Sequence, residues 1–254
     1  MNEEARLRAV RATVALLVIL GVSAAVGRTI FPDDLITRFE PVRQWLFDAF
    51  GRDDPRADTR AAALAVADGR FAAHPFLTRI HVVFGGLFVM FAPLQFSSAM
   101  RARNIRLHRW SGRILLPLAV ISVITSLYFG ILIPFGGLGE AIAIALFGGI
   151  FIASASRAYL AIRRKEVERH REWMIRTFAI ALSISTVRLV DAPVDLILTP
   201  AGVRPPGVLV VAMWTGWVIT VALAELWIRH TRANLHLRGN LQDQTPVTDT
   251  DFQT

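Results

Sequence analysis

Hydrophobic residues along this chain are gathered in long blocks, and short arginine-rich runs separate several of them. A helix needs about 20 apolar residues to cross a bilayer, and six blocks are close to this length or longer: residues 9–28, 76–97, 113–133, 138–162, 174–190 and 207–228. No strand-like alternation of apolar and polar residues competes with them. The pattern predicts an all-α, polytopic membrane protein with about six transmembrane helices.

Composition agrees with this class and narrows the chemistry. Hydrophobic residues make up 54% of the chain and charged residues only 19%, compared with roughly 25% charged residues in soluble domains. The absence of cysteine excludes disulfides, thiolate catalysis and cysteine-ligated iron–sulfur or zinc centres. No zinc-protease, nucleophile-elbow, Walker or dinucleotide-binding motif is present. Any metal chemistry therefore depends on the six histidines, the carboxylates or the methionines.

The positions of the basic residues predict the orientation in the membrane. With the N-terminus inside, 18 of the 28 Lys and Arg residues fall on the cytoplasmic side, next to hydrophobic spans. By the positive-inside rule, both termini are predicted to be cytoplasmic. The net charge of +8 is then mainly a topology signal. A nucleic-acid partner is not expected, because no aromatic reading surface interleaves the basic residues.

Five regions follow from these patterns. We expect a retained transmembrane anchor at residues 1–28, an extracytoplasmic loop at 29–75, and a four-helix membrane core, formed by helices 2–5, at 76–195. An outer loop and the sixth transmembrane helix occupy residues 196–230, and a disordered cytoplasmic tail occupies 231–254. Within the loop, apolar residues at helical spacing over 35–50 predict an amphipathic helix on the outer leaflet.

Two stretches of the predicted core echo each other. Phe84-Gly85-Gly86 leads to His108-Arg109-Trp110-Ser111-Gly112-Arg113, and Phe147-Gly148-Gly149 leads to His170-Arg171-Glu172-Trp173-Met174-Ile175-Arg176. Each unit has a hydrophobic segment, an arginine-rich connection, and a histidine at the start of the next hydrophobic segment. The core is therefore predicted to consist of two parallel two-helix units.

The two histidines of these boxes are the main candidates for a binding site. Both begin helices that run from inside to outside, so His108 and His170 start at the same depth. Two neutral imidazoles from different helices can hold one haem b iron. Nearby arginines could neutralise the haem propionates; they are Arg109, Arg113, Arg171 and Arg176. The same residues could instead cap helices or bind lipid phosphate, and the sequence leaves both interpretations open.

A second candidate group lies toward the outer side of the membrane. His81, Arg79, Arg188 and Asp191 fall there, and an ionisable residue within a span is a functional candidate by default. Such a group could serve a quinol head group or a proton relay, or it could form a buried ion pair that joins helices 2 and 5. Alignment of the two repeats on their FGG triplets carries His81 onto Ile144. A second bis-histidine centre is therefore not expected.

These motifs also support a resemblance. His81, Gly85-Gly86, Pro93-Leu94-Gln95-Phe96 and the two histidine boxes resemble the bacterial membrane-protein family called domain of unknown function 2306, over residues 70–195. The family has no established activity, so the resemblance implies a fold, a location in a bacterial inner membrane and a candidate site more than a reaction. A looser similarity is to haem-b four-helix carriers of the cytochrome b561 kind, in which paired helices supply axial histidines. The chain departs from that pattern at Ile144, which allows one haem or none.

Two kinds of function remain open. The first is a haem-b electron-transfer protein with His108 and His170 as iron ligands and a quinone or a membrane redox partner near the outer group. The second is a non-enzymatic scaffold, assembly partner or small-solute channel whose His-Arg boxes bind the lipid bilayer or a partner subunit. A secondary transporter is less favoured, because the repeat is parallel rather than inverted.

Overall fold

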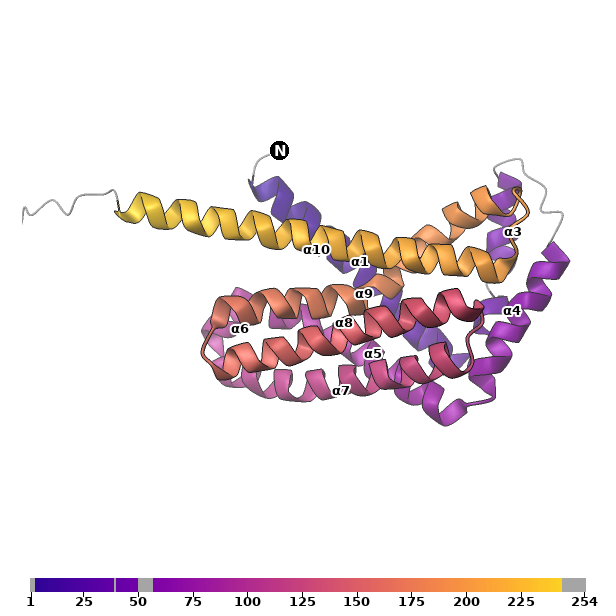
Figure 1. The fold of residues 1–254 in the computed structure, drawn as a ribbon, viewed down its shortest axis with the longest axis horizontal. Coiled ribbons are helices and arrows are strands. Elements are labelled where there is room, and N and C mark those ends of the chain that lie inside the picture. The colour runs from indigo at the N-terminus through magenta and orange to yellow at the C-terminus, as the bar shows by residue number, and fades with distance from the viewer. Residues whose placement is uncertain (1–2, 39, 50–56, 244–254) are drawn as a thin grey trace, which may run out of the picture.

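The chain is helical through nearly all of the part that the computed structural model describes, which is residues 3–38, 40–49 and 57–243 (Figure 1). No strand occurs in these ranges, in agreement with the predicted all-α class. The helices are α1 (Glu3–Ile30), α2 (Leu35–Arg38), α3 (Glu40–Ala49), α4 (Ala57–Ala72), α5 (Pro75–Gln95), α6 (Ser98–Arg103), α7 (Ile105–Leu132), α8 (Gly137–Arg163), α9 (Val167–Leu198) and α10 (Pro205–Asp243).

Five helices of the described part are long and apolar enough to cross a membrane: α1, α5, α7, α8 and residues Pro205–Ala233 of α10. The sixth predicted block, residues 174–190, lies within α9, which is not among the five. This helix contacts α1, α5, α8 and α10, and its Thr177, Ser183 and Ser185 are fully buried. Because other helices surround much of α9, its polar side chains can face protein rather than lipid. The chain is thus a polytopic all-α membrane protein with α9 inside the bundle.

The core is a four-helix bundle of α5, α7, α8 and α9. Helices α5 and α7 form one antiparallel pair, joined through α6, and α8 and α9 form the next (Figure 1). Because α7 and α9 each pack against α5 and α8, they occupy opposite corners of the bundle. Helix α10 lies along α9, and α1 crosses α5 and α9. This arrangement confirms a core built from two helix pairs.

Equivalent glycines of the two FGG triplets pack against the same helix. A Cβ added to Gly85 would lie 2.7 Å from the Ser122 hydroxyl, and one added to Gly148 would lie 2.9 Å from Cδ2 of Leu127. Ser122 and Leu127 both belong to α7. The missing side chains allow α5 and α8 to approach α7 closely, as small residues do in membrane bundles.

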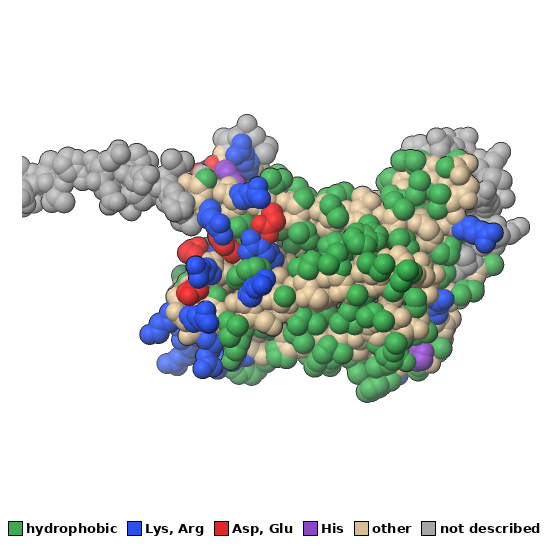
Figure 2. Space-filling model, viewed as in Figure 1, with side chains coloured by type: hydrophobic (Ala, Val, Ile, Leu, Met, Phe, Trp, Pro, Cys, Tyr) green, Lys and Arg blue, Asp and Glu red, His purple; other side chains and the backbone are tan. Residues whose placement is uncertain are grey.

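The two ends of the bundle differ in charge. Lys and Arg side chains gather at the end where α6 lies (Figure 2), which is also where α7 and α9 begin and α8 ends. We call this the basic end. Helices α2, α3 and α4 lie at the opposite end (Figure 1), and α3 falls within the predicted amphipathic segment 35–50.

The C-terminal boundary differs from the prediction. Helix α10 continues to Asp243, so residues 231–243 are helical although we expect a disordered tail over 231–254. No proline interrupts this stretch, and the helix of the last span can therefore extend beyond its apolar part. Residues 244–254 of the predicted tail lie outside the described residues.

Candidate functional site

Helix starts position both candidate histidines at the basic end. The Asn104 side chain caps α7 by accepting a hydrogen bond from the amide of Leu107 at 3.0 Å, which places His108 in the first turn. Lys165, with φ of 63°, lies in the tight turn between α8 and α9, and the amide of His170 donates to the carbonyl of Glu166 at 2.9 Å. The structure therefore brings the two histidines to one end of the bundle, as predicted.

The two imidazoles differ in their hydrogen bonding. Nδ1 of His170 lies 2.9 Å from the carbonyl oxygen of Ala158. A carbonyl only accepts, so Nδ1 carries the proton and Nε2 of the neutral ring keeps a free lone pair. Nδ1 of His108 is buried, and no described residue offers it a hydrogen-bond partner. His170 and Arg101 both lie within range of electrostatic interaction with His108.

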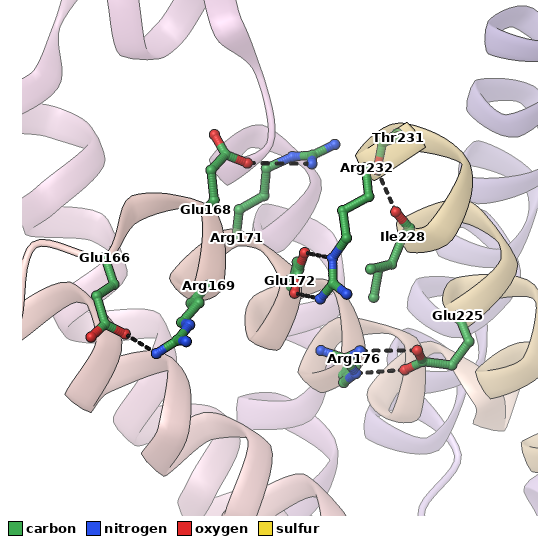
Figure 3. Close-up of polar contacts among 10 residues, drawn as sticks. All are labelled: Glu166, Glu168, Arg169, Arg171, Glu172, Arg176, Glu225, Ile228, Thr231 and Arg232. Carbon is green, nitrogen blue, oxygen red and sulfur yellow. Dashed lines mark hydrogen bonds and ion pairs between the residues drawn. The ribbon is translucent and has the colours of Figure 1, made fainter. Parts of the chain in front are cut away.

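The four predicted arginines divide into two pairs. Arg109 and Arg113 are exposed, and no described acidic residue forms an ion pair with either. Arg171 lies 4.0 Å from Glu168. Arg176 forms a bidentate ion pair with Glu225 of α10, at 2.5 Å and 2.9 Å (Figure 3). Of the four, Arg109 and Arg113 have the most freedom to bind an added anion.

Helix α10 contributes residues that the sequence interpretation missed. Glu225 binds Arg176, and Arg232, two turns further along α10, binds both carboxylate oxygens of Glu172 (Figure 3). The hydrogen bond from Arg232 lowers the pKa of Glu172 below its ordinary value. The available signal was Glu225, the single charged residue in the apolar block 207–228, since such a residue in a span generally has a partner.

Aromatic side chains fill the bundle interior deeper than the histidines. The ring of Phe178 lies 5.6 Å from that of Phe96 and 6.4 Å from that of Phe88, and Phe88 also contacts Phe151 at 6.3 Å. Phe178 follows His170 by eight residues, or about 12 Å along the helix. A ligand of the two histidines would therefore lie at the basic end of the bundle, between the aromatic layer and the surface.

The outer group is only partly assembled. Nδ1 of His81 lies 2.9 Å from the carbonyl oxygen of Ser122 and 3.4 Å from the hydroxyl of Thr125, so α7 satisfies this ring nitrogen. Arg188 lies within electrostatic range of His81 and of Asp191, and it donates to the carbonyl of Ile184 at 3.1 Å.

Arg79 lines a small cleft with Arg28 and Pro32, and Arg28 lies within electrostatic range of Arg188. Thus Arg188 interacts electrostatically with both His81 and Asp191, while Arg79 lies at the contact between α5 and the end of α1.

Of the two candidate groups, only the one at the basic end offers two histidines, His108 and His170, as metal ligands. In the described ranges, no cluster of three or more His, Asp or Glu side chains could hold a metal ion. Two imidazoles alone suit a metal whose other ligands come from a macrocycle, as in haem.

Comparisons with known proteins identify the family. No curated protein and no solved structure matches the chain. A family model described as "Predicted membrane protein (DUF2306)" matches residues 78–228, which is more than half of the chain and includes both histidine boxes. The protein therefore belongs to the DUF2306 family of predicted membrane proteins.

Proposed function

We propose that the protein binds one haem b through His108 and His170 and carries electrons in the bacterial inner membrane, with its basic end toward the cytoplasm. The observation that carries the proposal is the buried Nδ1 of His108, which has no hydrogen-bond partner among the described residues and lies within electrostatic range of His170. A buried polar atom without a partner costs about 1–3 kcal/mol. Coordination of iron by Nδ1 of His108 itself would remove that cost.

The surrounding residues fit a haem in three respects. The Ala158 carbonyl orients His170 and leaves its Nε2 free, which is a common second-shell arrangement for metal-binding histidines. Helices α7 and α9 occupy opposite corners of the bundle, so their histidines approach from two sides. Arg109 and Arg113 are available for the propionates, while Arg176 is committed to Glu225. When bound, a bis-histidine haem b would supply one-electron transfer between its ferric and ferrous states.

Absorbance of the purified protein tests the proposal. We expect a Soret band in the wild type and after haem is added to protein made without it. The band should be lost in His108→Ala and in His170→Ala. His230→Ala is the matched control, because His230 lies on α10 with its ring centre 6.2 Å from that of Trp227 and has no place in the proposed site. Colourless wild-type protein with normal helical circular dichroism, even after haem is added, would overturn the proposal.

The second candidate function is a non-enzymatic scaffold, assembly partner or small-solute channel. The exposed arginines of the basic end favour it: Arg101, Arg103 and Arg106 form no ion pair with an acidic residue in the described part of the chain. Such a surface can bind anionic lipid or an acidic partner subunit without any cofactor. A colourless but folded protein supports this alternative.

A further inference from the structure

A cavity of about 260 Å³ lies between α8, α9 and α10, outside the four-helix interior. Helix periodicity brings its walls together. Ile150, Ala153 and Arg157 follow one another at steps of three and four on α8, and Trp173 and Arg176 do so on α9. Val221 and Glu225 close the third side from α10. The cavity is separate from the histidine site, since neither histidine lines it.

The end of the cavity nearer the basic end carries an unbalanced positive charge. Both oxygens of Glu225 are used by Arg176 (Figure 3), so this pair contributes little net charge. The guanidinium of Arg157 lies 4.9 Å from the ring centre of Trp173, and that of Arg176 lies 4.6 Å from the same centre. No described acidic side chain forms an ion pair with Arg157. One arginine that is held by an aromatic ring therefore remains available to an anion.

The other end of the cavity is apolar. Ile150 lies seven residues before Arg157 on α8, about 10 Å deeper along the helix axis, and it is 39% exposed. Val221 faces the same space from α10. Since α8 and α10 are both membrane-spanning candidates, this opening meets lipid rather than water. A hydrophobic surface continues over the middle of the molecule beside the blue basic end (Figure 2).

We propose that this cavity is a binding site for an anionic phospholipid. The phosphate binds Arg157 beside Trp173, and the first part of one acyl chain lies against Ile150 and Val221. The order of features along the membrane normal matches that of the lipid: a charge beside an interfacial tryptophan, then aliphatic side chains. The volume suits the headgroup-proximal part of one lipid, while the rest of that lipid stays in the bilayer.

Native mass spectrometry of the detergent-purified protein tests this site with phosphatidylglycerol and with phosphatidylcholine of the same chains. We expect Arg157→Gln to weaken phosphatidylglycerol binding roughly tenfold, because it removes a charge-assisted hydrogen bond. Phosphatidylcholine binding should fall less, because the choline cation of that lipid offsets the charge of its phosphate. Arg164→Gln is the matched control. It makes the same charge change at the end of the same helix, outside the cavity lining, and should change binding less than about twofold.

A second variant tests the apolar part without a change of charge. Ala153→Phe fills the cavity and should weaken the binding of both lipids while the Arg157 guanidinium remains. Inorganic phosphate at millimolar concentration should not displace the lipid. Equal effects of Arg157→Gln and Arg164→Gln, no effect of Ala153→Phe, or full displacement by inorganic phosphate would each overturn the proposal.

Discussion

The ion pair between Arg28 and Asp68 should be a main support of the end opposite the basic end. The two side chains are only 7% and 2% exposed, and their closest nitrogen and oxygen atoms are 2.7 Å apart. Asp68, on α4, also accepts hydrogen bonds from the amides of Ile36 and Thr37 and from the Thr37 hydroxyl. One carboxylate thus joins α1, α2 and α4.

The expected cost of removing this carboxylate follows from its burial. Loss of one partner from a buried ion pair costs about 3–5 kcal/mol, because the other charge stays buried without compensation. In Asp68→Ala, the Arg28 guanidinium keeps the Pro32 carbonyl at 3.1 Å and the face of Phe71 at 4.8 Å, but it has lost its counter-ion. We therefore expect Asp68→Ala to lower the free energy of unfolding by about 3–5 kcal/mol. Asp68→Asn keeps one oxygen acceptor and should lose less.

Asp34 provides the matched control. Its ion pair with Arg38 has the same residue types and the same 2.7 Å distance, but its side chains are about half exposed. Asp34→Ala should cost no more than about 1 kcal/mol, because water screens exposed pairs. Reversible unfolding in detergent, followed by tryptophan fluorescence, measures both variants against the wild type. Equal losses of stability in Asp68→Ala and Asp34→Ala would refute the reasoning, since Asp68 is buried and accepts three further hydrogen bonds, whereas Asp34 is half exposed.

Two further predictions concern the contacts of α8, α9 and α10. A Cβ on Gly216 would lie 2.8 Å from the backbone nitrogen of Val187, whereas one on Gly149 would meet no atom within 4 Å. Gly216→Ala should therefore lower the free energy of unfolding by about 1–3 kcal/mol, and Gly149→Ala should be neutral or stabilise by up to about 1 kcal/mol; the reverse order in the same unfolding assay would contradict this. The pKa of Glu172 is lowered in the folded protein, chiefly by its hydrogen bond from Arg232, so the stability that this carboxylate contributes is present above its ordinary pKa and is lost as the pH falls through the lowered value. The stability difference between wild type and Glu172→Gln should accordingly shrink on acidification below about pH 4, and a difference that stays constant would exclude an ionised Glu172 as its source.

The membrane helices could be predicted from the sequence because apolarity is a local property of each span. All five spanning candidates overlap predicted blocks. The exception is instructive, because α9 depends on its neighbours. Its buried hydroxyls at Thr177, Ser183 and Ser185 are acceptable only inside a bundle. Which helices surround α9 cannot be predicted from the sequence of α9 alone. Helix α10 is longer than predicted, because a polar composition indicates disorder in an isolated segment but does not stop a helix that continues from a membrane span.

The candidate site was predictable where it depended on helix direction and not where it depended on distant partners. His108 and His170 share one end because α7 and α9 run in the same direction. The sequence predicts this direction, because one membrane-spanning helix, α8, separates the two. The role of Arg176 depends on Glu225, 49 residues away on a helix outside both histidine boxes. No spacing within the boxes indicates that Arg176 would be neutralised while Arg113 would remain free.

The FGG repeat is best explained as a repeat of helix packing, because equivalent positions of the two units contact the same helix, α7. Residues 81 and 144 are equivalent by the triplet alignment, and both face α7. His81 contacts the Ser122 carbonyl there, whereas Ile144 packs where a side chain on Gly130 would otherwise lie, with its Cδ1 only 2.3 Å from the position of a Cβ. The same geometry therefore accepts an imidazole in one copy and an aliphatic side chain in the other. The shared packing of α5 and α8 against α7 explains why the two units are similar in sequence. Because packing alone accounts for this similarity, the repeat does not require two equivalent cofactor sites.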